Sequence, residues 1–177
     1  MYCDPSGMAK DDNKIFIEIV DNKKFREQFS ILGKSHTKTY VTGTVYSKGS
    51  VNTIDRTVYQ LNDINWDYVS CNPTNRKGLS NRKLAHLGKV PYGLDDQWIE
   101  LHHLTQTEPG TMIEIMGSKH DKYSKQLHGM ISAGESFRNN EELSAQYEKF
   151  RKEYWKKRIE DVENAEKTKC LCSKKGG

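Results

Sequence analysis

The sequence predicts an α+β fold. A small sheet would be built around a strand–turn–strand–helix unit, with a β-containing extension before it and a long C-terminal helix after it. Two short runs of alternating apolar residues lie between residues 98 and 116, and a Glu-Pro-Gly turn separates them. A segment of helical character follows Gly117 and Ser118, where Ser118 is a plausible N-cap. Apolar residues then recur at helical spacing over about residues 141–163.

The composition limits what kind of protein this can be. A chain of 177 residues favours one domain with a hydrophobic core. Because 34% of the residues are hydrophobic and 29% are charged, we expect a modest core and long loops. The net charge of +4 is compatible with a polyanionic substrate. We expect no membrane span, since no long apolar run is present, and the N-terminus lacks the apolar core of a signal peptide.

The first third of the chain carries no recognisable chemical signature and is interpreted as a scaffold or a linker. Strands are expected at Lys14–Val20, at Tyr40–Tyr46, which Gly43 weakens, and at Arg56–Leu61. His36 lies among Ser, Thr and Lys residues and is expected in an exposed loop. A short helix is predicted around residues 80–87, inside a segment rich in Asn, Arg, Lys and Gly. This segment either contacts phosphate or is a polar connector.

Four of the six histidines fall in the strand–turn–strand–helix unit: His102, His103, His120 and His128. Hydrolysis of a phosphodiester needs a base to deprotonate water and a cation to stabilise negative charge. A neutral imidazole can take a proton or bind a metal. Because successive strand side chains point to opposite faces, His102 and His103 can serve one site only if the strand ends or bulges at the pair.

The helical histidines are awkwardly spaced for metal binding. His120 and His128 are eight residues apart, which is about 12 Å along a continuous helix. They could share an ion only by leaning together or if the helix breaks between them. We therefore rank His102 and His128 first as ligands and His120 second, and phosphate binding by His120 stays open. Imidazole ligands suit zinc, nickel, cobalt or manganese better than magnesium, and the ion is undecided.

This pattern resembles the LHH group of the HNH and endonuclease VII nucleases, the His-Me finger class, a group of predicted toxin domains. The resemblance covers about residues 55–130. It rests on Leu101-His102-His103, Gln106, Glu114, His120 and Leu127-His128, on the upstream Asn81-Arg82-Lys83-Leu84, Gly88-Lys89, Pro91, Gly93 and Asp95-Asp96, and on Val58-Tyr59 with Asp63-Ile64-Asn65-Trp66.

The resemblance implies a ββα-metal nuclease core with a single divalent ion. In that interpretation His103 is the base that activates water, and His102, His128 and His120 hold the ion. Glu114 and Glu100 could orient the metal-bound histidines from behind. The residues expected to contact phosphate are Arg82, Lys89, Gln106, Lys119 and Lys125.

The implied activity is a metal-dependent, largely sequence-nonspecific DNA endonuclease. Two alternatives stay open. One is a ribonuclease or tRNase toxin with the same fold. The other is a non-catalytic binding module, in which the metal and the histidines only stabilise the fold.

The N-terminus suggests how such a domain would be delivered. Asp4-Pro5-Ser6-Gly7 resembles the Asp-Pro-x-Gly junction that closes the shell of rearrangement-hotspot and wall-associated polymorphic toxins, although it is also an ordinary turn sequence. We therefore expect a toxin domain secreted as part of a larger protein, with the parent shell N-terminal to it. It would act on DNA in the cytoplasm of the target cell, and its producer would need a cognate immunity protein.

The expected organisation has three parts. Residues 1–54 would form the junction and N-terminal extension, residues 55–165 the nuclease domain, and residues 166–177 a disordered tail. The four cysteines show no metal-binding spacing and are expected to be free thiols, as suits a protein acting in a reducing cytoplasm: Cys3, Cys71, Cys170 and Cys172.

Overall fold

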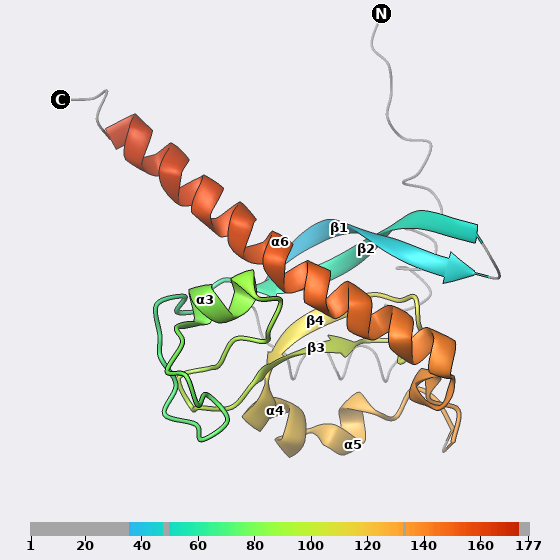
Figure 1. The fold of residues 1–177 in the computed structure, drawn as a ribbon. Helices are drawn as coiled ribbons and strands as arrows, with labels where there is room; N and C mark the ends of the chain where they lie inside the picture. Colours follow the sequence, from blue (N-terminus) through green and yellow to red (C-terminus); the bar gives the residue numbers. More distant parts are fainter. Residues whose placement is uncertain (1–35, 48–49, 133, 174–177) are drawn as a thin grey trace, which may run out of the picture.

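The structure is a computed structural model that describes residues 36–47, 50–132 and 134–173 (Figure 1). The strand expected at Lys14–Val20 and the Asp4-Pro5-Ser6-Gly7 junction lie outside the described residues. Four strands form one sheet in the order β1-β2-β4-β3. Their bounds are β1 His36–Ser47, β2 Ser50–Leu61, β3 Ile99–His103 and β4 Met112–Met116.

Strands β1 and β2 pair antiparallel, and β2 joins the second hairpin through a short parallel pairing with β4. Strand β3 pairs antiparallel with β4 alone and so forms an edge of the sheet. The helices are α3 Asn81–His86, α4 Gly117–Lys122, α5 Ser124–Leu127 and α6 Glu141–Ser173, with a 3-10 turn η1 at Phe137–Asn139. The predicted mixed α+β fold, with a small sheet and a long C-terminal helix, is confirmed.

The sheet has two covered faces. Helix α6 crosses one face (Figure 1) and packs its predicted apolar stripe there, where Tyr154, Trp155 and Ile159 are buried against the strands. The other face is covered by α4 and α5, where Leu127 packs against apolar residues of β2 and β4. Each strand of the β3–β4 hairpin is thus buried on both sides, and its alternate side chains enter different cores.

Helix α6 is longer than the sequence predicted. It begins at Glu141, as expected, but continues to Ser173 instead of ending near Glu163, so the expected disordered tail is wrong for residues 166–173. The apolar stripe ends near Val162, and no hydrophobic periodicity remained to indicate the last turns. Ala, Glu and Lys in that stretch favour a helix without packing. The expected boundary at residue 54 falls within β2.

One short helix confirms its prediction, whereas the N-cap expected for another is wrong. Helix α3 lies where it was predicted, and the Ser80 side chain accepts a hydrogen bond from the Lys83 backbone N–H at its start. Ser118 does not cap α4, because the helix already includes Gly117 and the Ser118 hydroxyl donates to Asp95 instead.

Two further expectations can be compared with the described chain. Cys71 and Cys170 are exposed, and neither forms a disulfide within the described residues, as predicted for these two of the four cysteines. None of the described helices combines the length and the apolar character needed to cross a membrane.

Candidate active site

Three histidines from separate elements converge beside β3. His102 comes from the strand, His120 from α4, and His128 follows the last residue of α5. Their ring centroids are 5.1, 5.2 and 4.9 Å apart, and one ligand nitrogen from each lies within 4.8 Å of the others. The structure therefore brings His120 into the same cluster as the two histidines that ranked first.

A break in the helix makes this convergence possible. Tyr123 separates α4 from α5 with φ −110° and ψ 19°, outside the α-helical region. Its half-buried ring packs on the core that contains Leu127, which holds the second segment against the sheet. His120 and His128 consequently lie on one side of a bent segment, and the distance of about 12 Å expected for a straight helix does not apply.

The protonation of the cluster fits a metal site. The buried His102 Nε2 has no hydrogen-bond partner. Burial, followed by the neighbouring His120 and His128, lowers the pKa of His102 to about 3, so this ring is neutral. The His128 Nδ1 lies 2.9 Å from the Ser124 carbonyl oxygen, to which it can only donate. This tautomer leaves the lone pair on Nε2.

His120 is oriented by an acidic neighbour. Its Nδ1 lies 3.2 Å from Glu100 Oε2, and Asp121 Oδ1 is 4.0 Å away. Burial lowers the pKa of His120, while Glu100 opposes that shift. Glu100, His120 and Asp121 also have oxygen and nitrogen atoms within reach of one ion. A buried imidazole nitrogen without a hydrogen-bond partner, with two further imidazoles and carboxylate oxygens close by, fits a divalent cation.

His103 points to the other face of the sheet, as strand alternation requires. Its Nε2 is 2.6 Å from Glu108 Oε2, and its ring packs against Phe137 and Tyr147. Burial lowers the pKa of His103 below its usual value, and Arg56 also lowers it, against the opposing influence of Glu108. With Nε2–H donated to the carboxylate, the remaining nitrogen Nδ1 is the one that can accept a proton.

Glu108 is held in place by a buried network. Arg56 of β2 donates from Nη1 to Oε2 at 2.8 Å, and its Nη2 lies 2.6 Å from Oε1. Gln146 of α6 donates to Oε1 at 2.7 Å. Burial alone would raise the pKa of Glu108, but the hydrogen bonds from His103, Arg56 and Gln146 outweigh it and lower the pKa to about 2. The carboxylate is therefore ionised beside His103.

The two histidine groups meet in one cleft. Because β3 is an edge strand and ends at His103, side chains from both of its faces border the space beyond its edge. The cleft has a volume of about 250 Å³. Its lining includes all four histidines, Glu100, Gln106, Phe137, Arg138 and Tyr147. The condition set by the sequence, that the strand should end at the pair, is met.

Glu114 does not lie behind the three clustered histidines, contrary to expectation. Strand alternation turns its side chain toward α6, away from His102. The fully buried carboxylate accepts hydrogen bonds from the Leu61 backbone N–H, the Tyr154 hydroxyl and the Arg158 guanidinium. Its role in the structure is to tie β2 and α6 to β4.

Arg82 was also expected in the site, as a phosphate contact, and it lies elsewhere. Its guanidinium forms ion pairs with Asp67, Glu163 and Glu166, which join α3 to α6. These three carboxylates surround the partly exposed Arg82 guanidinium and balance its positive charge. The sequence could not show this, because Glu163 and Glu166 are more than 80 residues away.

The other four expected phosphate contacts lie in four different places. Gln106 lines the cleft, but its Oε1 accepts a hydrogen bond from the Met130 backbone at 2.7 Å. Lys89 lines a neighbouring groove described below. Lys125 is exposed on α5 and does not line the cleft. Lys119 borders a different cavity.

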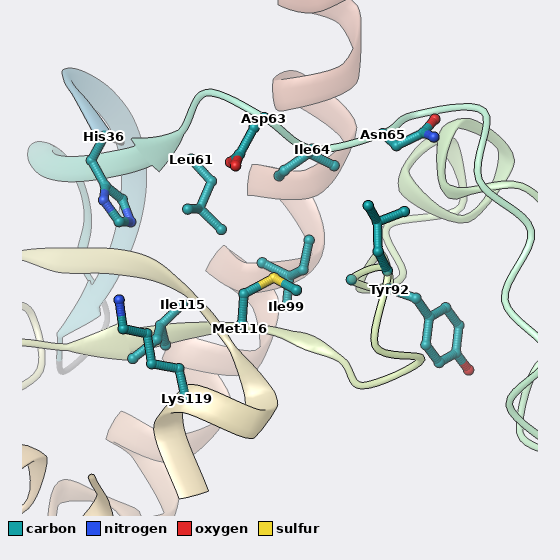
Figure 2. Close-up of a pocket in the computed structure, with 12 residues that line it drawn as sticks. His36, Leu61, Asp63, Ile64, Asn65, Tyr92, Ile99, Ile115, Met116 and Lys119 are labelled. Atoms are coloured by element: carbon teal, nitrogen blue, oxygen red, sulfur yellow. The ribbon is translucent and has the colours of Figure 1, made fainter. Parts of the chain in front are cut away.

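That cavity, of about 190 Å³, has a largely apolar wall (Figure 2). Ile99, Ile115 and Met116 form part of the wall, and Lys119 and His36 lie on the same side of it. His36 is half-buried at the start of β1, and its Nε2 lies 2.8 Å from the Glu114 backbone oxygen. The expectation that His36 belongs to an exposed loop is therefore wrong.

Sequence reasoning missed the residues that support His103. Glu108 was assigned only to the turn between the strands, and Arg56 and Gln146 were not singled out. The local signal in the sequence was Glu108 itself, an acidic residue five positions after His103 in the short connection between the two strands. The partners of Glu108 are 52 and 38 residues away and become evident only in the fold.

Comparison with known proteins agrees with this geometry. Residues 80–161 match the LHH family model, described as a nuclease of the HNH/ENDO VII superfamily with conserved LHH. The matched segment contains α3, the β3–β4 hairpin, all four clustered histidines and the first part of α6. The α+β fold is consistent with an HNH/His-Me nuclease fold, and the match supports a nuclease function. No solved structure matches the chain.

Proposed function

We propose that the protein is a metal-dependent DNA endonuclease, largely indifferent to sequence, that acts as an antagonistic bacterial toxin. One observation carries the proposal. The adjacent His102 and His103 lie in two kinds of environment, a cluster of three imidazoles and an imidazole bonded to a carboxylate, and both environments border one cleft. Metal binding and proton transfer are the two tasks that phosphodiester hydrolysis requires.

His103 performs the proton transfer in this mechanism. Its Nδ1 takes a proton from water as the water oxygen bonds to phosphorus, and the bond from phosphorus to the leaving oxygen breaks. The proton that His103 gains leaves an imidazolium ion, which the ionised Glu108 stabilises through Nε2–H. Arg56 and Gln146 fix the direction of that carboxylate, so the ring is held in one tautomer.

His102, His120 and His128 would hold the divalent cation. Bound there, the ion would bind the scissile phosphate and stabilise charge on the leaving 3′ oxygen. The ligand set suits zinc, nickel, cobalt or manganese better than magnesium. Glu100 orients His120, and the Ser124 carbonyl orients His128.

Contacts to phosphate without contacts to bases give binding without sequence preference. The cleft offers guanidinium and imidazole groups, which suit a backbone phosphate. A ribonuclease or tRNase toxin of the same fold is the second candidate, since the same groups serve either sugar.

We further propose the biological setting implied by the N-terminal junction. The domain would be exported as the C-terminal part of a larger toxin and would act in the cytoplasm of the target cell. A cognate immunity protein would protect the producer, either by filling the cleft near His103 or by binding the basic face of α6.

One experiment separates the candidates. Purified protein is incubated with plasmid DNA and with total RNA, side by side, across a series of divalent ions and with chelator. We expect plasmid nicking that needs the ion and that His103→Ala abolishes. Cleavage of RNA alone would favour the ribonuclease, and the absence of any cleavage with retained metal binding would favour a metal-stabilised binding module.

A further inference from the structure

A second groove extends the histidine cleft along the edge of β3. It has a volume of about 510 Å³, and it shares Glu100, Leu101, Arg138 and Tyr147 with the cleft. Its other lining residues include Lys89, Trp98 and Arg151. The groove therefore lies directly next to the cleft that holds the histidines.

Three cations line the groove from two separate parts of the chain. Lys89 is exposed and forms no ion pair within the described residues. Arg138 and Arg151 share one carboxylate, Glu148, and the Arg138 Nη1 donates to it at 2.8 Å. A guanidinium has five N–H donors, so both arginines keep donors for another ligand. Arg138 also lies over the Tyr147 ring at 4.2 Å, which fixes its position.

The groove also has an aromatic wall. Trp98 is 36% exposed, although its ring stacks on Tyr92 with the centroids 4.1 Å apart. A cationic groove with an aromatic wall is the arrangement that binds a nucleic-acid strand, in which the charges follow the backbone and the ring contacts a base. Among the described residues that line the groove and the cleft, Glu100 is the one carboxylate, and it is paired with His120.

We propose that this groove is a subsite for the nucleotide next to the scissile bond. Lys89, Arg138 and Arg151 bind the flanking phosphate, and Trp98 contacts the base or sugar attached to it. The inference rests on the proposed nuclease function and adds the residues that bind a second phosphate. It predicts that substrates with more than one phosphate are cleaved faster than a substrate with only the scissile one.

The test compares a thymidine pentanucleotide with a thymidine dinucleotide, which lacks a flanking phosphate. We measure the ratio of the two kcat/KM values for the wild type, Lys89→Ala, Arg138→Gln and Trp98→Leu. Lys167→Ala serves as the control, because it removes an equal charge near the C-terminal end of α6. Thermal unfolding of each variant checks that the fold persists.

We expect the ratio to fall at least fivefold in each groove variant and to keep its wild-type value in Lys167→Ala. The kcat/KM for the pentanucleotide should decrease with salt, and Lys89→Ala should make this dependence weaker. The slope of log kcat/KM against log salt should become less negative by about 0.7, the value for one phosphate contact to a single strand. A wild-type ratio in Lys89→Ala and Arg138→Gln overturns the phosphate subsite, and a wild-type ratio in Trp98→Leu overturns the base contact. Cleavage of neither substrate by the wild type overturns the nuclease proposal itself.

Discussion

Replacing Glu108 by Gln removes one charge from the network behind His103 and changes little else in size. In the folded protein the pKa of Glu108 is lowered from its usual 4.5 to about 2. That shift corresponds to about 3 kcal/mol of stability at neutral pH. Removing one partner of a buried ion pair costs about 3–5 kcal/mol, so the two arguments agree in size. We expect Glu108→Gln to lower the unfolding free energy by about 3 kcal/mol.

The same change should also slow cleavage in molecules that remain folded. A neutral amide stabilises an imidazolium less than a carboxylate does. Its NH2 group also cannot accept from Arg56 Nη2 and Gln146, which both approach the second carboxylate oxygen of Glu108. We expect a loss of about 10²-fold, within the usual contribution of a general base. Plasmid nicking is measured at saturating metal and well below the unfolding temperature, while calorimetric titration confirms that metal affinity persists.

Glu166→Gln is the matched control. It removes a carboxylate from the exposed ion pair with Arg82, and exposed pairs contribute about 0–1 kcal/mol. Glu108→Asp keeps the charge and should recover part of the rate. If folded Glu108→Gln nicks plasmid as fast as the wild type, Glu108 only stabilises the fold and the positioning role is refuted.

Three other predictions follow from the same structure. The Glu108 carboxylate stabilises the folded state above pH 4.5, and this contribution is lost as the pH falls from 4.5 toward 2. The difference in unfolding free energy between the wild type and Glu108→Gln should therefore shrink to less than half between pH 7 and pH 3. Denaturant unfolding at the two pH values measures this difference. Gly43→Ala would place a Cβ 2.6 Å from the Phe150 ring, which stacks on Arg56, so it should cost about 1–3 kcal/mol and an unchanged Tm would count against this packing. Tyr154→Phe should cost about 1–3 kcal/mol by removing a buried bond to Glu114 while metal affinity stays at the wild-type value; a large loss of affinity would place Glu114 in the metal site after all.

The immunity proposal has its own test. Co-expression with the neighbouring reading frame should yield a tight one-to-one complex with an acidic protein. Cells that tolerate the wild-type domain without any antidote would contradict it.

Local patterns in the sequence were sufficient to predict much of the fold. Alternation and helical spacing placed β3, β4 and the start of α6, and the paired histidines marked the end of β3. The spacing of His120 and His128 indicated that they could share a metal ion if the helix broke between them. The sequence could not place that break at Tyr123, because a single residue with non-helical dihedral angles leaves no periodic signal.

The non-local contacts were out of reach. Whether Glu114 faces the histidines or α6 depends on the register of β4. The three groups that donate hydrogen bonds to its carboxylate come from residues 61, 154 and 158. The partners of Glu108 come from β2 and α6. Sequence patterns predicted both elements, but they could not show how these elements pack against the turn that contains Glu108. Arg82 was expected to contact phosphate because the family resemblance covers it, but its carboxylate partners on α6 lie far along the chain.

The division of labour between His102 and His103 is the central claim, and a single pair of variants tests it. His103→Ala and His102→Ala are each titrated with metal in a calorimeter and assayed for plasmid nicking. We predict that His103→Ala binds metal like the wild type and loses about 10²- to 10⁴-fold in cleavage. His102→Ala should bind metal weakly and recover part of its activity at higher metal concentration. Loss of the metal in His103→Ala with retention in His102→Ala would reverse the roles, and unchanged cleavage in both variants would contradict the active site altogether.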